Sequence, residues 1–253
     1  MRQTRQAARS SSHPEVLQEI GAPVELRRHP GARRMTLRVS RTRHAVIVTV
    51  PVQCNLDDAN TFLNRNLDWV RERLVDLPTR SDLAHDCELP LRGERHRIVF
   101  TGVRARRGHG PVTRVPAVDG GLPELHVAGE AEHAPRRLGD WLFAEARRDL
   151  DAAVRVHAGR LALNPKRISI RDQASRWGSC STTRVLSFSW RLILAPPLVL
   201  DYVAAHEVAH LAEMNHGPRF WALVARTMPR MEEAKRWLNV HGIELHRYQL
   251  PKR

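Results

Sequence analysis

HEVAH, residues 206–210, is the stretch of sequence that decides how this chain is read. It lies within residues 198–214, where nearly all the other side chains are apolar. A helix that is apolar on every side is buried in the protein. Burying His206, Glu207 and His210 there costs free energy unless each side chain finds a partner, and a metal ion is one such partner.

The spacing of these three side chains fits a metal site on a helix. Residues four apart differ in direction by about 40°, so the imidazoles of His206 and His210 point to one place beside the helix. Glu207 is turned by about 100° from His206, so it is not a third ligand on that side. It is placed to accept a proton from a zinc-held water, whose pKa falls to about 7. The motif therefore predicts one Zn²⁺ per chain, with Glu207 as the catalytic base.

A third protein ligand is required, and the sequence offers two candidates. Glu213 would continue the ligand side of the helix if the helix ran on. His216 follows Asn215 and precedes Pro218, where a left-handed asparagine and then a proline would end the helix and turn the chain back. We expect His216 to be the ligand, with Glu213 outside the ligand set. The histidine spacing equals that of the metzincins, but Glu213 replaces their glycine, so the turn is built differently.

The rest of the chain predicts an α+β protein. Alternation at 35–39 and an apolar run at 45–50 predict two paired strands, and helical spacing follows from Asn55 to about Pro78. Further strands are predicted at 97–100 and 125–127. A long helix is predicted from about 135 to 163. The patterns at 168–170 and 186–190 then predict a hairpin with residues 173–183 as its loop.

These elements suggest three parts. Residues 1–22 form a basic disordered tail, and residues 23–134 form a β-rich basic N-terminal domain. Residues 135–253 form a helical domain with a small antiparallel sheet, and this domain contains HEVAH.

The charge is strongly positive, with 41 Lys and Arg against 27 Asp and Glu and a net charge of +14. Seven arginines lie within residues 27–43 with no acid among them, and seven more lie within residues 92–114 with Glu94 alone. A basic surface attracts polyanions, so a polyanion or nucleic acid is a possible partner. The alternative is a solvated basic face without a partner.

Cysteine usage and hydropathy indicate in which cellular compartment the protein is expected. Cys54, Cys87 and Cys180 are widely separated and contain no C-x-x-C pair, which argues against a disulfide framework and against a cysteine-ligated zinc site. The N-terminal residues carry no apolar signal core, and no apolar run reaches the roughly 18 residues that a membrane span needs. We expect a cytoplasmic protein with no membrane partner, and the sequence leaves the oligomeric state open.

Several further groups of residues lie around HEVAH at spacings that belong together. They are SRWGSCS at 175–181, WRL at 190–192, Pro196, YV at 202–203, NH at 215–216 and FW at 220–221. Together they resemble the YgjP-like metallopeptidase family, which is related to the WLM and SprT-like groups. The resemblance runs from about Met35 to about Leu245. It implies a zincin-type catalytic domain with a three-histidine zinc site and a glutamate base.

Some residues near the motif are candidates to bind substrate. Arg176, Ser179 and Arg191 could donate hydrogen bonds to a carboxylate or phosphate near the metal. The structural alternative for 175–181 is that Trp177 fills a core while Gly178 permits a tight turn. Tyr202, one turn before His206, is a candidate oxyanion stabiliser. The others are Arg191, His241, His246 and Tyr248. The strand at 186–190 is a candidate to align a peptide as an added strand.

Three functions follow. The first is a zinc metallopeptidase, in which zinc polarises the scissile carbonyl while Glu207 activates water and returns its proton to the leaving amine. The second is a nucleoside triphosphate (UTP) pyrophosphatase using the same site, since some similar proteins carry that label and the arginine excess suits a triphosphate. Against it, a P-loop is absent and three histidines are atypical of Mg²⁺ sites. The third is a nucleic-acid-associated SprT-like protease, for which no nucleic-acid-binding signature is present.

Overall fold

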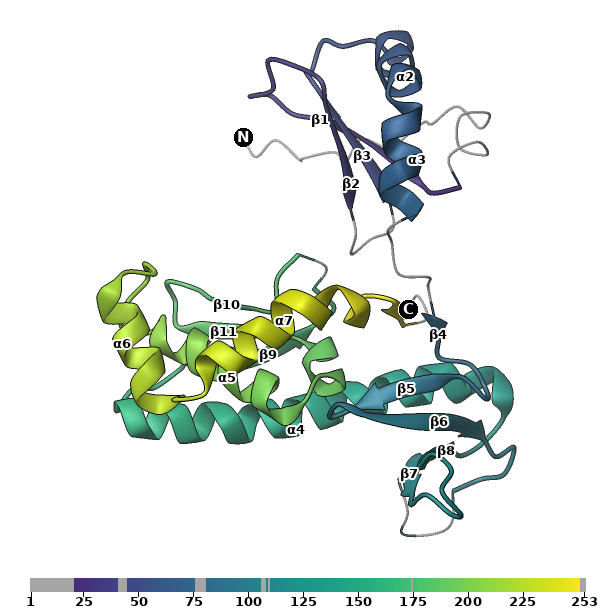
Figure 1. Cartoon of the computed structure of the whole chain (residues 1–253), viewed down its shortest axis with the longest axis vertical. Helices are drawn as coiled ribbons and strands as arrows, with labels where there is room; N and C mark the ends of the chain where they lie inside the picture. The colour runs from purple at the N-terminus through teal and green to yellow at the C-terminus, as the bar shows by residue number, and fades with distance from the viewer. Residues whose placement is uncertain are drawn as a thin grey trace, which may run out of the picture. The chain divides into compact units, whose positions relative to one another are not determined.

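The structure of the protein is a computed structural model (Figure 1). It describes residues 21–40, 45–75, 81–105, 108, 110–173 and 175–250. The chain divides into two compact units between residues 78 and 79, and each unit is described by itself. The boundary expected between residues 134 and 135 falls inside the second unit. Of the tail expected over residues 1–22, all but the last two residues lie outside the described part.

The first unit contains a three-stranded sheet. Its strands are β1 (Val24–Arg28), β2 (Thr36–Ser40) and β3 (Ala45–Val50), in the order β1-β3-β2. β3 is parallel to β1 and antiparallel to β2. The pairing of β2 with β3 confirms the two paired strands that the alternation predicts.

Two helices complete this unit where the sequence predicts one. They are α2 (Leu56–Arg65) and α3 (Leu67–Val75). The Asn55 side chain accepts a hydrogen bond from Asp58 N at 2.7 Å and begins α2, as expected. Asn66 interrupts the predicted helix, since its side-chain Nδ2 donates to the Phe62 carbonyl at 2.7 Å. The core of the unit consists of Val46, Val48, Val50, Ala59, Leu63 and Val70.

The second unit begins with a four-stranded sheet. Its strands are β5 (Glu88–Leu91), β6 (Glu94–Phe100), β7 (Val112–Val115) and β8 (Glu124–Val127), in the order β5-β6-β8-β7. After η1 (Ala131–His133), helix α4 (Ala134–Leu161) contacts β7 and β8 and runs on past α5 (Figure 1). Buried residues of this sheet and of α4 form one core. That shared core explains why residues 81–134 group with the C-terminal part.

The second sheet of this unit stands beside the HEVAH helix. It contains β9 (Arg167–Arg171), β10 (Gly178–Cys180) and β11 (Val185–Ser189), in the order β10-β11-β9. β9 and β11 are parallel, so the predicted hairpin between them is wrong, because a hairpin joins antiparallel strands. The sheet is mixed rather than antiparallel, because the expected loop contains β10, which pairs antiparallel with β11. This order leaves β10 at the edge of the sheet.

The remaining elements include the HEVAH helix itself, which is α5. They are η2 (Trp190–Leu194), α5 (Pro197–Ala209), α6 (Pro218–Thr227), α7 (Met231–Leu245) and β12 (Tyr248–Gln249). α5 contacts α4, α6, α7 and β10. β12 pairs in parallel with β4 (Ser81–Asp82), at the start of the same unit. None of the helices in the described ranges is both long enough and apolar enough to pass through a membrane.

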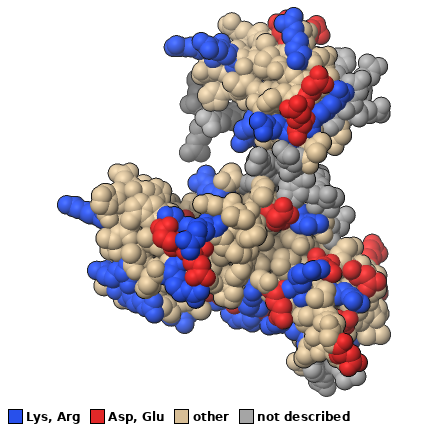
Figure 2. Space-filling model, in the orientation of Figure 1, with Lys and Arg blue, Asp and Glu red and all other residues tan. Residues whose placement is uncertain are grey.

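The two arginine clusters belong to different units. The cluster at 27–43 lies in the first unit and the cluster at 92–114 lies in the second. On the face of each unit seen in Figure 2, Lys and Arg side chains are interspersed with Asp and Glu.

Candidate metal centre

The HEVAH helix is buried, as its apolar composition predicts, but it is shorter than expected. α5 ends at Ala209, and His210 is its C-cap with helical dihedral angles. The backbone then tightens, with Leu211 N donating to Val208 O at 3.0 Å and Ala212 N donating to Ala209 O at 3.1 Å. Asn215 is not among the described residues with positive φ. A tight turn therefore ends the helix, and the expectation of a left-handed Asn215 is wrong.

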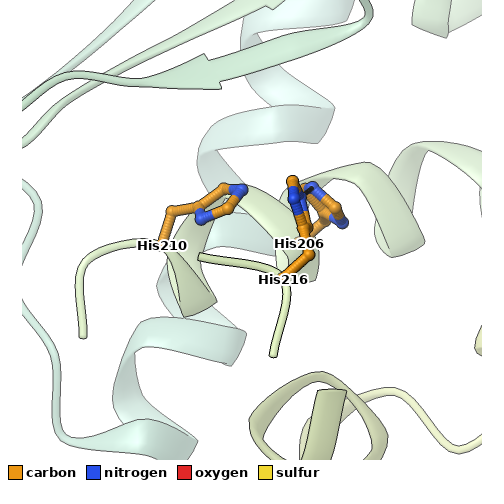
Figure 3. A group of neighbouring side chains, drawn as sticks. All are labelled: His206, His210 and His216. Carbon is orange, nitrogen blue, oxygen red and sulfur yellow. Dashed lines mark hydrogen bonds between the residues drawn. The ribbon is translucent and has the colours of Figure 1, made fainter. Parts of the chain in front are cut away.

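The three histidines predicted as ligands come together at the end of this helix. One ring nitrogen from each of His206, His210 and His216 lies within 4.8 Å of the others. Nε2 of His216 is 3.1 Å from Nε2 of His206. Figure 3 shows all three imidazoles gathered at one place, two from the HEVAH motif and one from the following loop. The side chain of Glu213 is not part of this group.

Glu213 contributes through its backbone instead. Its carbonyl oxygen lies 3.0 Å from Nδ1 of His210, so that nitrogen donates to the carbonyl and Nε2 is left for a metal. Metal-binding histidines usually donate their second ring N–H in this way, which fixes the ring's orientation and tautomer.

The donor set fits zinc. Zinc in proteins takes imidazole nitrogens at about 2.0–2.1 Å in tetrahedral geometry, which places the ligand atoms roughly 3.3 Å apart. The pKa of His206 is lowered to about 4, first by burial and then by the neighbouring His210 and His216. At neutral pH its ring is therefore uncharged, the form that binds a metal.

Glu207 lies against β10 and lines the same cleft as the three histidines. A Cβ built on Gly178 would lie 2.5 Å from Glu207 Oε1. The backbone of β10 is therefore closer to the carboxyl than it could be with any residue other than glycine at position 178. Glu207 Oε2 is buried without a hydrogen-bond partner among the described residues. Burial raises the pKa of Glu207 to about 8, and the positive charge of Arg176 opposes that rise. A buried carboxyl with an unpartnered oxygen beside three histidines is an arrangement that a ligand would complete.

Aromatic side chains form the wall behind the histidines. The ring of Phe220 is fully buried, with its centroid 4.5 to 4.8 Å from those of the three imidazoles. The sequence predicts Phe220 as core and misses this contact. His216 lies in the loop before α6, so helical spacing does not relate the two residues and the sequence carries no signal for this contact.

The metal centre opens into a cleft of about 510 Å³. Besides the HEVAH residues, it is lined by Ser175, Arg176, Gly178, Ser179 and Cys180 on one segment and by Met214 and His216 on another. The predicted residues Arg176 and Ser179 line this cleft, as does Cys180, whose thiol pKa is raised by burial and then by Glu207.

The other substrate-binding candidates do not line the cleft. Arg191 is buried, donates from Nε and Nη2 to the Tyr248 carbonyl at 3.2 and 3.0 Å, and pairs with Asp172. Its donors are used inside the protein, so Arg191 is not available to a substrate. Tyr202 is buried with its ring edge-on to His206, and burial, followed by the charges of Glu232 and Glu207, raises its pKa to about 12.

The remaining oxyanion candidates also lie outside the cleft lining. The His246 ring packs on Trp177, with ring centroids 4.8 Å apart. The His241 ring lies 5.1 Å from that of Trp237. Tyr248 belongs to β12, whose backbone carbonyl accepts from Arg191.

A comparison with protein-family models places most of the chain in one family. The family model described as "YgjP-like, metallopeptidase domain" matches residues 33–241. Among solved structures, the crystal structure of the metallopeptidase zymogen of Pyrococcus abyssi abylysin is similar at 18% identity and a TM-score of 0.33. That match covers 36% of this chain and 93% of that chain. No curated protein matches the sequence.

Proposed function

The chain belongs to the YgjP-like metallopeptidase family, and from this premise we propose that it is a zinc-dependent peptidase. His206, His210 and His216 would hold the metal, and Glu207 would be the catalytic base. The observation that carries the proposal is the unpartnered, buried Glu207 Oε2 next to three converging imidazole nitrogens. A carboxyl isolated in this way is suited to moving a proton, because no protein donor competes for its oxygen.

The chemistry divides between the metal and the protein. When bound, a zinc ion acts as a Lewis acid toward the scissile carbonyl and lowers the pKa of water. Glu207 accepts the proton of the attacking water as the water oxygen bonds to the carbonyl carbon. It then donates that proton to the amine nitrogen as the peptide bond breaks. Burial raises the pKa of Glu207, and the positive charge of a bound metal ion would lower it again, which would favour the ionised carboxyl that a base requires.

Two neighbours keep this arrangement in place. The Glu213 carbonyl holds the His210 ring through Nδ1, and the Phe220 ring fills the space behind the imidazoles. Both contacts hold the histidine side chains in their rotamers before a metal binds, so metal binding costs little side-chain conformational entropy.

The edge strand β10 is suited to align the substrate. β11 is the central strand of its sheet, so it cannot accept a further strand. The alignment of a peptide that we expect of residues 186–190 therefore falls to β10. Gly178, Ser179 and Cys180 of β10 line the cleft beside Glu207. An extended peptide added to this edge would pair its backbone with the strand and pass the metal centre.

A parallel substrate assay tests the proposal. Zinc-loaded wild type and the Glu207→Gln variant would each be incubated with unfolded casein and with UTP. We expect peptides from casein with the wild type and none with the variant, at equal zinc content. UTP is included because an arginine in the cleft also suits a triphosphate. Release of pyrophosphate without peptide release would overturn the peptidase assignment.

A further inference from the structure

Arg176 differs from Arg184 and Arg191 in having its donors free. It is exposed, lines the cleft, and has neither a hydrogen bond nor an ion pair with any described residue. Arg184, by contrast, donates from Nε and Nη2 to the Asn164 carbonyl at 3.0 and 2.8 Å. Arg191 is committed to Tyr248 and Asp172. The guanidinium of Arg176 therefore remains available to a group that enters the cleft.

The charge in the cleft is concentrated on this residue. Apart from the histidines, the charged side chains that line the cleft are Arg176 and Glu207. Glu207 is the proposed base, so Arg176 is the lining side chain left to meet a charge on the substrate. The hydroxyls of Ser175 and Ser179 lie on the same segment.

Arg176 also lies close to the expected path of a peptide. It precedes Gly178 by two residues, and a rise of about 3.3 Å per residue keeps their Cα atoms within about 7 Å of each other. Gly178 contacts Glu207 directly. A substrate extended along β10 advances by a similar distance per residue. Its second or third residue from the scissile bond would therefore pass Arg176.

We propose that Arg176 is a specificity-determining residue, and that it binds a carboxylate of the peptide within three positions of the bond that is cleaved. The planar guanidinium matches a carboxylate through two parallel hydrogen bonds. The carboxylate belongs either to an acidic side chain or to the C-terminus of the substrate, and the chemistry is the same in both. This inference rests on the proposed peptidase function and adds the class of substrate to it.

The test uses zinc-loaded full-length protein and two series of fluorogenic peptides. In the first series, one Glu is moved through three positions on each side of the scissile bond, with Gln at the same place as its uncharged match. In the second, the C-terminus is a free acid or an amide. We expect kcat/KM to favour the carboxylate roughly tenfold at one position, mostly through KM.

Variants then assign the preference to Arg176. Arg176→Ala should remove it, Arg176→Glu should reverse it toward Lys, and Arg176→Lys should keep part of it. The matched control is Arg171→Ala, since Arg171 is exposed, lies outside the cleft lining, and among the described residues its guanidinium hydrogen-bonds to Ser169 Oγ alone, at 3.3 Å. It should leave the preference unchanged. Zinc content and melting temperature of each variant should equal those of the wild type, because Arg176 makes no internal bond.

The outcomes separate this inference from the function on which it rests. If zinc-loaded wild type cleaves neither casein nor any peptide, the peptidase function itself fails. If it cleaves peptides but treats Glu and Gln alike at every position, the peptidase stands and the role of Arg176 is overturned. A preference that persists in Arg176→Ala would also overturn it. Pyrophosphate release from UTP that depends on Arg176, without peptide cleavage, would assign the guanidinium to a phosphate instead.

Discussion

Gly178 and Glu207 lie in direct contact, and a Cβ built on Gly178 would come within 2.5 Å of the Glu207 carboxyl oxygen and 2.6 Å of its Cγ. This contact joins the edge strand of a sheet to the helix that carries the proposed metal ligands. The glycine lets the strand backbone approach the carboxyl and fixes the side on which the carboxyl lies.

The first prediction follows from this contact. Gly178→Ala should displace the Glu207 carboxyl while leaving the three imidazoles in place. We expect kcat to fall by about tenfold to a hundredfold, since a shift of roughly 1 Å in a catalytic group has effects of that size. Zinc content should stay at one per chain. The matched control is Gly159→Ala on α4, where a Cβ meets nothing within 4 Å. Loss of zinc together with activity would show that the contact serves folding rather than the base.

The second prediction separates the two candidates for the third ligand. His216→Ala should remove zinc from the purified protein, as should the double change of His206 and His210 to Ala. Glu213→Ala should retain it, because Glu213 uses its backbone carbonyl and not its carboxylate. Metal analysis after dialysis measures this directly. Retention of zinc by the His216 variant, with loss from the Glu213 variant, would reverse the assignment.

The third prediction concerns the pH dependence of the metal-free protein. Folding raises the pKa of Glu207 from 4.5 to about 8, so the folded state binds that proton more tightly than the unfolded state. The contribution of Glu207 to stability should therefore fall as pH rises through this window and level off above it. Because the contribution of His206 rises up to pH 6.5, the net fall should appear between pH 6.5 and about 8. Melting temperatures of the chelator-treated protein measure the fall, and Glu207→Gln should flatten it. A curve for this variant parallel to that of the wild type would contradict the assignment.

His206 has the opposite sign and is the internal control for that experiment. Folding lowers its pKa from 6.5 to about 4, so its contribution is present above pH 6.5 and is lost as pH falls toward 4. The Glu207→Gln variant should keep this acid-side loss. A His206→Ala variant should reduce the acid-side loss while keeping the fall that Glu207 causes at higher pH.

The fourth prediction concerns Arg191. Arg191→Ala leaves the Tyr248 carbonyl without its donor, and we expect unfolding free energy to fall by about 2 to 3 kcal/mol. Denaturant unfolding measures the change. The activity of each folded, zinc-loaded molecule should be unchanged, since Arg191 does not line the cleft. A selective rise in KM at full stability would restore Arg191 as a substrate-binding residue.

The residues of the metal centre differ in how far sequence predicts them. The directions of His206, Glu207 and His210 depend on helical geometry alone, so spacing is sufficient. The prediction of His216 as a ligand depends on the helix ending before it. The helix does end there, although the turn that ends it differs from the expected one. The packing of Phe220 depends on where α6 lies after that turn.

Long-range pairing explains most of what the sequence does not predict. The sequences of β9 and β11 are strand-like. The alternation of apolar and polar residues is the same for parallel and antiparallel partners, so sequence favours a hairpin as the simpler arrangement. Arg176 and Arg191 look alike in sequence. The structure distinguishes them, because Arg191 donates to the carbonyl of Tyr248, 57 residues further along the chain, whereas the guanidinium of Arg176 has no hydrogen-bond partner among the described residues.

The pairing of β4 with β12 has a consequence for how the second unit is closed. The strand at Ser81–Asp82 begins this unit and the strand at Tyr248–Gln249 ends it, so the two ends meet side by side. Arg191 binds the backbone of β12 and holds this junction to the core. Such a unit is a candidate for circular permutation, because its ends can be joined by a short linker and reopened at an exposed loop far from the histidines. The order in which its elements are synthesised would then change while the metal helix kept all of its neighbours.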